Sequence, residues 1–248
     1  MTKEKESKDL EVKQEGAVAL RRSGGDKQPA GFDGVEEGDI KMPRLSVLQG
    51  LSEICIEGKG KMGDLANSLT KEIYGADLEF IPLFMFKTRA QFETGKGLVM
   101  YSRDNIKVTM ALEGFAEHLD KPVEEVPGAE WNGDQPPTFG VVYNFPIMLV
   151  GNLFQFPISL SLMKTATKAA KELVSMARYS GEDMFARVYS IKSKIEKSDQ
   201  GTYAVPVIEF KRRCTDEEYA TAKIVFDKLY RLKNKIDVEL EAEPAENK

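Results

Sequence analysis

The chain has 248 residues, of which 42% are hydrophobic, so it can build a core and fold as one large domain or two small ones. No stretch approaches the roughly 18 apolar residues of a membrane span, and the charged N-terminus lacks the apolar segment of a signal peptide. The two cysteines, Cys55 and Cys214, have neither metal-ligand nor disulfide-framework spacing. We therefore expect a reduced, cytoplasmic protein that does not contact a membrane.

The net charge of −5 is unevenly distributed along the chain. Residues 1–39 hold seven Lys/Arg against ten Asp/Glu, and residues 237–248 hold one Lys against five acids. The body between them, residues 40–236, therefore carries a net charge of +2. Because charges are screened beyond roughly 8 to 10 Å at cellular salt, the acidic ends do not exclude a nucleic-acid partner for this body.

Composition divides the chain into three segments. Residues 1–38 alternate charges with Gly, Ser and Gln without an apolar period, which predicts a disordered arm. Apolar residues become dense from Ile40 onward, so we expect a single globular domain over residues 39–236. The last segment, 237–248, is rich in acids and is expected to be a disordered tail.

Strand signals dominate the first part of the body. Residues 78–89 are rich in aromatic and branched residues, and the turn 94–97 returns the chain along 98–102. Residues 112–138 contain Pro, Gly and the only Trp, Trp131, and are expected to form a long excursion between strands. A hairpin is predicted for 139–150 and 154–163, and two further strands for 184–195 and 203–210.

Two helices are predicted, one between these strands and one after the last of them. The first is predicted for residues 165–179, with Thr165 as its cap and Gly181 just beyond its end. Its helical period separates two faces, the polar Lys164, Lys168, Lys171, Ser175 and Arg178 and the apolar Ala166, Ala170, Leu173 and Ala177. The second is predicted for about 215–235 and opens with a capping box, Thr215 to Glu218. The fold class is therefore α+β and β-rich.

Enzyme signatures are sparse. His118 is the only histidine and has no neighbouring cysteine, which argues against a His-based triad or a zinc site. The segment Gly58-Lys59-Gly60-Lys61 resembles a phosphate-binding loop in composition only. We therefore expect no enzymatic activity, no cofactor and no metal.

Non-specific binding of a single strand needs cations for phosphates and aromatic faces for bases. The cations of the body that could serve are Lys41, Arg44, Lys59, Lys61, Lys87, Arg89, Lys164, Lys168, Lys171, Arg178, Arg187 and Lys192. Tyrosine tolerates exposure better than phenylalanine, so the candidate base platforms are Tyr101, Tyr143, Tyr189 and Tyr203. The plainer interpretation is that the cations form solvated faces and that strand aromatics such as Phe80 and Phe210 belong to the core.

The acidic tail has two interpretations. It can serve solubility alone. It can also compete with nucleic acid for a basic groove and, once displaced, contact basic replication or recombination proteins. The residues that would do so are Asp237, Glu239, Glu241, Glu243 and Glu246.

Three segments, 39–45, 67–83 and 157–171, resemble a group of bacteriophage proteins described as single-stranded DNA-binding. The resemblance spans about residues 39–230. It implies an OB-like barrel or curved antiparallel sheet with an inserted helix, and a role in phage DNA replication or recombination in the host cytoplasm. On this hypothesis single-stranded DNA runs across a concave sheet face, and a homo-oligomer is possible. The alternatives are a phage protein that binds and redirects a host protein, or a virion structural component.

Overall fold

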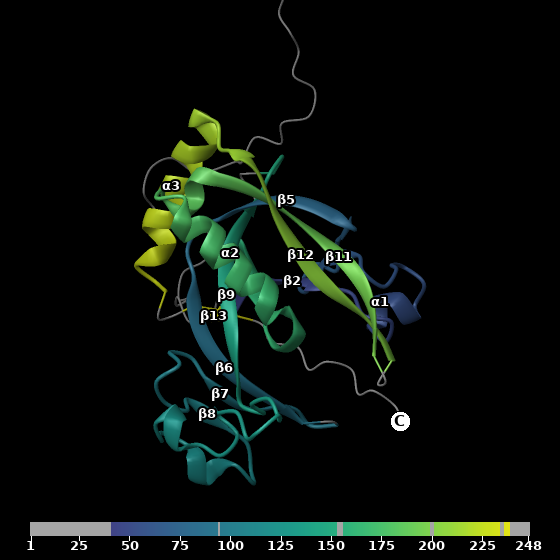
Figure 1. The fold of residues 1–248 in the computed structure, drawn as a ribbon, viewed down its shortest axis with the longest axis vertical. Coiled ribbons are helices and arrows are strands. Elements are labelled where there is room, and N and C mark those ends of the chain that lie inside the picture. Colours follow the sequence, from purple (N-terminus) through teal and green to yellow (C-terminus); the bar gives the residue numbers. More distant parts are fainter. Residues whose placement is uncertain (1–40, 94, 153–155, 199–200, 234–235, 239–248) are drawn as a thin grey trace, which may run out of the picture. The chain divides into compact units, whose positions relative to one another are not determined.

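The computed structural model describes residues 41–93, 95–152, 156–198, 201–233 and 236–238. The chain divides into two units, Met1–Glu36 and Glu37–Lys248, and every described residue belongs to the second. Strands dominate this unit, as predicted (Figure 1).

Thirteen strands occur among the described residues. In chain order, the first seven are β1 (Lys41–Met42), β2 (Arg44–Val47), β3 (Leu65–Asn67), β4 (Ile73–Gly75), β5 (Asp77–Pro82), β6 (Phe86–Glu93) and β7 (Gly97–Ser102). They continue with β8 (Met110–Ala111), β9 (Gly140–Leu149), β10 (Ile158–Leu162), β11 (Arg187–Ser198), β12 (Gly201–Arg213) and β13 (Asp237–Val238).

Within the described residues, eleven of these strands form one open sheet, in which eight follow the order β12-β11-β5-β9-β10-β2-β3-β4 and β6, β7 and β8 lie off this path. All the pairs in this sheet are antiparallel except β10 with β2. Strand β9 is the branch point, since its later residues pair with β5 and its earlier residues pair with β6, which leads to β7 and β8. The run Val141–Leu149 is almost entirely apolar because most of it is covered on both faces.

The helical segments are α1 (Glu53–Ile56), α2 (Thr167–Tyr179) and α3 (Asp216–Tyr230), with the short 3-10 turns η2 (Ala116–His118), η3 (Val123–Glu125), η4 (Lys164–Ala166) and η5 (Met184–Ala186). The predicted apolar face of the first long helix is confirmed, because Ala170, Leu173 and Ala177 are buried. The predicted cap at Thr165 is wrong, since that residue lies inside η4 and the helix has no side-chain cap.

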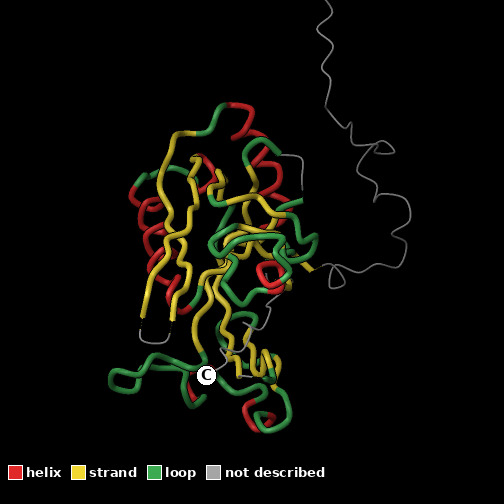
Figure 2. The backbone as a smooth tube through the Cα atoms, turned by 90° about the vertical axis from the view of Figure 1, so that its right-hand side faces the viewer, coloured by secondary structure: helices red, strands yellow, loops and turns green. Residues whose placement is uncertain are grey.

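The two long helices pack on opposite faces of the sheet. Helix α2 buries Ala170 and Leu173 in a cluster with Phe145 and Tyr189. Helix α3 buries Ala222 in a second cluster that includes Ile81, Met148 and Val188. Figure 2 shows helices on both sides of the strands. The central sheet is therefore a layer enclosed by helices.

The C-terminal helix is shorter than predicted. Helix α3 ends at Tyr230 rather than near residue 235. The chain then returns to β13, in which Asp237 pairs with Lys41 of β1 in a parallel two-stranded sheet. The predicted start of the acidic tail at Asp237 is thus wrong by two residues, because Asp237 and Val238 are part of a strand.

The predicted excursion between strands is a lobe with its own core. It comprises β7, β8, η2 and η3, and its interior is a cluster of Val99, Met100, Val108, Val123, Val126, Ala129 and Phe139. The predicted hairpin connects the lobe to the rest of the sheet. Its strand β7 pairs with β6, and β6 in turn pairs with β9.

Candidate nucleic-acid interface

The solvent side of α2 combines cations with an aromatic ring. Lys168, Lys171 and Arg178 are exposed, and no ion pair to another described residue neutralises them. Tyr179 is 90% exposed. It follows Ser175 by four residues and Lys168 by eleven, so it lies on the same side of the helix. We call Lys168, Lys171, Ser175, Arg178 and Tyr179 the α2 face.

A groove runs beside this face. It has a volume of about 610 Å³ and is lined by Thr167, Lys168, Lys171, Glu172, Ser175 and Met176 of α2 and by Ile208 of β12. We call it the α2 groove. Phe210 lies two residues further along the same face of β12 and is 43% exposed. An aromatic ring is therefore partly exposed on the face of β12 that carries Ile208, where the sequence predicted only core packing.

Arg187 is held against that ring. Its guanidinium carbon lies 4.9 Å from the centroid of the Phe210 ring. Its Nε donates a hydrogen bond to Glu182 at 2.7 Å, and Arg213 also contacts Glu182 at 2.8 Å. The hydrogen bond from Arg187 lowers the pKa of Glu182. Arg187 is therefore a positioned cation whose charge is partly balanced by a carboxylate.

Two further cations lie over aromatic rings. Lys87 Nζ is 5.3 Å from the centroid of the Tyr143 ring, and Tyr143 packs against the same core cluster that α2 covers. Lys164 Nζ is 5.9 Å from the centroid of the Phe92 ring. Such pairs place a positive charge beside a flat apolar face. Both are the kind of contact that a nucleotide could share.

Two of the four predicted base platforms lie in the core. Tyr189 is completely buried, with its ring centroid 6.1 Å from that of Phe80, and burial raises the pKa of its hydroxyl. Tyr101 is 8% exposed and packs with Ala90 and Val142. Neither ring offers a face to a base, because both strands are covered at these positions.

Arg89 is half-buried, and its side chain makes hydrogen bonds within the fold. Its Nε donates to Asn105 Oδ1 at 2.8 Å, and its Nη1 donates to the carbonyl oxygens of Ala129 and Phe139. These bonds connect β6 to the lobe. The guanidinium is therefore engaged by the fold itself.

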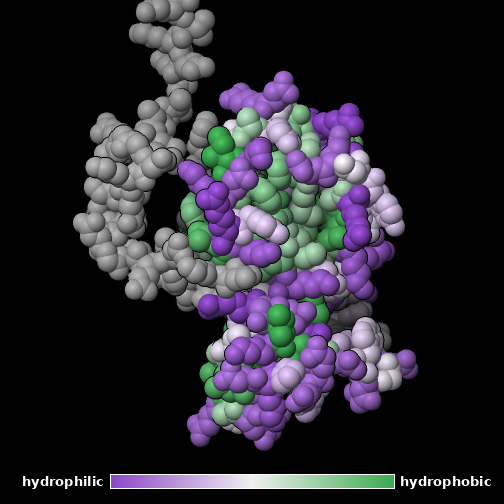
Figure 3. All heavy atoms as spheres, turned by 90° about the vertical axis from the view of Figure 1, so that its left-hand side faces the viewer, coloured by the Kyte–Doolittle hydropathy of each residue, from purple (hydrophilic) through white to green (hydrophobic). Residues whose placement is uncertain are grey.

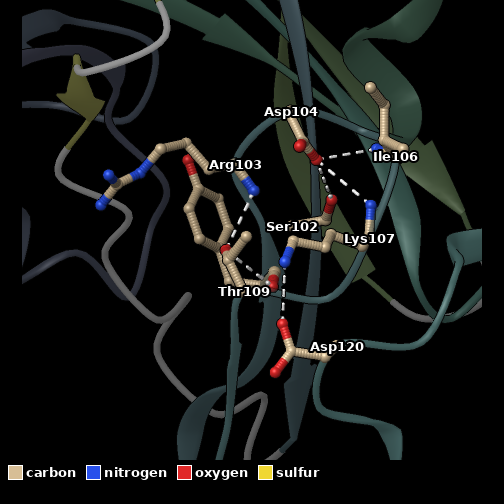
Figure 4. Close-up of polar contacts among 8 residues, drawn as sticks. Ser102, Arg103, Asp104, Ile106, Lys107, Thr109 and Asp120 are labelled. Atoms are coloured by element: carbon tan, nitrogen blue, oxygen red, sulfur yellow. Dashed lines mark hydrogen bonds and ion pairs between the residues drawn. The ribbon is translucent and has the colours of Figure 1, made fainter.

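Figure 4 shows a cluster of polar residues in the lobe, which holds the loop between β7 and β8 in place. Asp104 Oδ1 accepts hydrogen bonds from the backbone N–H groups of Ile106 and Lys107, and Lys107 Nζ pairs with Asp120 at 2.9 Å. Burial alone would raise the pKa of Asp104, but these hydrogen bonds and one from Ser102 together lower it. The cluster stabilises a turn, and no group of three potential metal ligands occurs among the described residues.

The remaining predicted site residues are scattered. Lys59 pairs with Glu57 at 2.7 Å, and Lys61 is exposed in the same loop. Lys192 lies between Asp77 and Glu209, on the face of β11 opposite to Tyr189. Further positions are Lys41 in β1, the half-buried Arg44 in β2 and the half-buried Tyr203 in β12. Glu239, Glu241, Glu243 and Glu246 lie outside the described residues.

Part of the sheet is closed to the expected path of DNA across a concave sheet face. The face formed by Phe145, Leu160 and Ile191 is covered by α2 and contributes to the main core. The outer side of α2 and its boundary with β12 form an open groove. The structure thus places the predicted polar face of the first long helix beside the α2 groove.

The model of a family described as "Pam3 phage gp34-like protein" matches residues 12–235. The chain belongs to this phage family. No curated protein and no solved structure matches the chain. The bacteriophage origin implied by the resemblance is therefore confirmed, while the binding of single-stranded DNA stays a prediction.

Sequence reasoning missed two aromatic residues of this phage protein. Tyr179 could have been found by extending the polar stripe of the helix one position past Arg178. Phe210 carried no comparable signal, because the alternation of β12 places it on the same face as the core residue Ile208.

Within the described residues, no helix is long and apolar enough to cross a membrane.

Proposed function

We propose that this phage protein binds single-stranded DNA without sequence preference, along the α2 groove. The observation that carries the proposal is the 90% exposed ring of Tyr179 at the end of α2, next in sequence to Arg178 and on the same side of the helix as Lys168, which lines the groove. Backbone phosphates need such cations, and base stacking on an aromatic ring contributes about 1 to 3 kcal/mol. Replication or recombination of phage DNA in the host cytoplasm would be the setting, and no catalytic step is involved.

The test is a titration of the full chain with oligo-dT at several salt concentrations. If about four to six phosphates are neutralised, log K falls with log salt at a slope of roughly −3 to −4. The double variant Lys168→Gln/Lys171→Gln should make this slope shallower by about 1 to 1.5, because each phosphate contact contributes about 0.7. A slope near zero for the unmodified chain would refute the proposal.

A matched control lies on α3. Lys223 and Lys228 are exposed like the lysines of α2, but they belong to the helix on the other side of the sheet. Figure 3 views the side of the molecule on which α3 lies in Figure 1, and it shows hydrophilic side chains between the apolar areas of that surface. The variant Lys223→Gln/Lys228→Gln removes the same charge and should leave the slope within about 0.5 of the original value.

A second candidate function is binding of a host protein through the lobe. Trp131 is 67% exposed and Ile106 is 66% exposed, and large exposed apolar side chains favour protein contacts. This candidate predicts that one host protein co-purifies with the phage protein and that oligo-dT does not bind.

A further inference from the structure

The outer edge of β12 is an open strand edge beside the α2 groove. Strand β12 is the last strand at one end of the sheet order, and β11 pairs with its inner edge. On the outer edge, the side-chain amide of Gln49 bonds to both the N–H and the carbonyl of Ala204. Backbone groups alternate along an antiparallel strand, so those of Ile208 and Phe210 also point outward.

This open stretch is limited at both ends. Pro206 has no N–H to donate, and the regular pairing of β12 with β11 shifts just beyond Phe210. Between these limits, no backbone hydrogen bond to another described segment uses the N–H of Ile208 or Phe210. Three consecutive residues are exposed here, namely Glu209, Phe210 and Lys211. The edge can therefore accept one short additional strand.

The α2 side of the groove favours an acidic strand. Lys168, Lys171 and Glu172 line the groove together with Ile208, so two cations stand against one acid. Neither lysine has an ion pair to another described residue. An extended segment in this position would meet backbone donors and acceptors on one side and lysines on the other. A basic strand would be repelled there.

Residues 237–243 have the sequence pattern of such a strand. Their sequence, Asp-Val-Glu-Leu-Glu-Ala-Glu, alternates acids with apolar residues at every position, and Pro244 ends the pattern. In an extended chain this period of two places all the acids on one face. Acids two positions apart are about 6.8 Å apart along a strand, and Cβ atoms three positions apart on a helix are about 5 to 6 Å apart. Two acids can therefore meet Lys168 and Lys171 together.

The same chain is not placed to supply this strand. Strand β13 pairs with β1, and Met42 and Ile236 beside this pair are buried in the cluster that α3 covers. The α2 groove belongs to the helix on the opposite face of the sheet. Glu241, in the middle of the pattern, is at most about 10 Å of extended chain from Val238. No spacer remains to carry it around the sheet, so the strand must come from a second copy.

We infer that residues 239–243 of a second copy add a strand to the open edge of β12. Their acids face Lys168 and Lys171, and Leu240 and Ala242 lie on the other face, along the half-buried Val207. This contact between copies goes beyond the proposed function and requires no DNA. Because it joins different surfaces of the two copies, it links them into rings or open chains. DNA in the same groove would displace it.

The experiment mixes two forms of the full chain and follows one of them by NMR. The receiver is ¹⁵N-labelled and carries Glu239→Gln, Glu241→Gln and Glu243→Gln, whereas the donor is unmodified and unlabelled. Hydrogen exchange at the receiver amides of Ile208 and Phe210 should slow about sixfold when the donor is at five times its Kd. The amides that face β11, at Val207 and Glu209, should change much less.

Two pairs of variants separate strand pairing from charge alone. The donor Leu240→Glu/Glu241→Leu keeps the charge and composition of the segment but breaks its alternation, so it should no longer protect Ile208 and Phe210. Undiminished protection would contradict an added strand. The receiver Lys168→Gln/Lys171→Gln should bind the donor several-fold more weakly, whereas the matched control Lys223→Gln/Lys228→Gln on α3 should bind it as before.

The remaining outcomes separate this inference from the proposed function. Absence of protection at every donor concentration overturns the inference, while binding of oligo-dT in a separate titration still supports the proposed function. Protection in the unmodified chain that does not depend on its concentration assigns the strand to the same chain and also overturns the inference. Protection by the donor without any binding of oligo-dT upholds the contact between copies and refutes the proposed function.

Discussion

At the scale of single residues, Tyr179 is exposed more than any other large hydrophobic side chain that the structure describes. Its ring contributes nothing to the core, so its contribution to the free energy of unfolding should be small. An exposed aromatic ring that follows Arg178, at the end of a helix face that also carries Lys168 and Lys171, is, however, well placed for stacking on a base. Binding and stability can therefore be separated at this position.

We expect Tyr179→Ala to weaken binding of oligo-dT about fivefold or more, because stacking on one ring contributes about 1 to 3 kcal/mol. The midpoint of urea unfolding should remain unchanged. Fluorescence anisotropy and urea titration measure the two effects. The control is Trp131→Ala, which removes another exposed aromatic ring, from the lobe, and should leave affinity intact. Equal losses for both variants would contradict a specific role for Tyr179.

Glu218 is the residue that connects α3 to β12. Its carboxylate accepts hydrogen bonds from Arg212 Nη1 and Nη2 at 2.6 and 2.8 Å and from the backbone N–H of Thr215 at 2.8 Å. The Thr215 hydroxyl in turn accepts from the Glu218 N–H, which completes the predicted capping box. The hydrogen bonds from Arg212 contribute most to lowering the pKa of Glu218, which falls to about 2.

This pKa makes stability depend on pH in a defined direction. The pKa is lower in the folded chain than its usual value of 4.5, so the stabilisation is complete above that pH and is lost as the pH falls toward 2. We expect Glu218→Gln to lower the free energy of unfolding by about 1 to 2 kcal/mol near neutral pH. The difference from the unmodified chain should shrink between about pH 5 and pH 2 in urea titrations.

The control for this prediction is Glu217→Gln. Glu217 is exposed in the same helical turn and belongs to no ion pair between described residues. Its substitution should change the free energy of unfolding by less than about 0.5 kcal/mol. A Glu218→Gln effect that stays constant over the whole pH range would disprove the electrostatic explanation.

At the scale of elements, the side chain of Gln49 joins the end of β2 to β12, two strands that are not neighbours in the sheet. Its Nε2 donates to the carbonyl oxygen of Ala204 at 3.0 Å, and its Oε1 accepts from the Ala204 N–H at 2.9 Å. The amide thus replaces a strand residue in pairing with the outer edge of β12.

We expect Gln49→Ala to lower the free energy of unfolding by about 1 to 3 kcal/mol, because two hydrogen bonds are lost. Hydrogen exchange at the Ala204 amide should accelerate more than exchange at the distant β6–β7 hairpin. Gln49→Glu keeps an acceptor for the Ala204 N–H but places a carboxylate oxygen against the Ala204 carbonyl oxygen, so at neutral pH its effect should be at least as large as that of Gln49→Ala. Unchanged protection of the Ala204 amide in Gln49→Ala would show that the edge of β12 is held by other contacts.

At the scale of the whole molecule, charge is separated between the ends of the chain and its body. Residues 239–248 contain four Glu and one Lys, and they follow directly after β13. We propose that this polyanion competes with DNA for the cations of the α2 face. The pairing of β13 with β1 means that a clean deletion must begin after Val238 rather than at Asp237.

Truncation after Val238 should raise the affinity for oligo-dT several-fold at low salt, because an intramolecular competitor is removed. The gain should disappear as salt rises and screens the interaction. A full-length chain with Glu239, Glu241, Glu243 and Glu246 changed to Gln should behave like the truncated chain if charge is responsible. Identical salt titrations with and without the tail would exclude the competition.

Much of the fold could be predicted from local patterns. The capping box at Thr215, the two faces of α2 and the β6–β7 hairpin each depend on residues within a few positions of one another. The helical and strand periods report these features directly. The candidate site could be predicted only in part, since Lys168, Lys171 and Arg178 lie together whereas Tyr189 and Arg89 are engaged in the core and the lobe.

The sequence by itself determined the class of the fold, the polar face of α2 and the charge contrast between the body and the tail. Only the tertiary structure decided that α2 covers the sheet, that a groove lies between α2 and β12, and that Gln49 reaches Ala204 across 155 positions of the chain. The physical reason is that helical and strand periods arise from neighbouring residues. The exposure of one side chain, by contrast, depends on which distant elements pack against it.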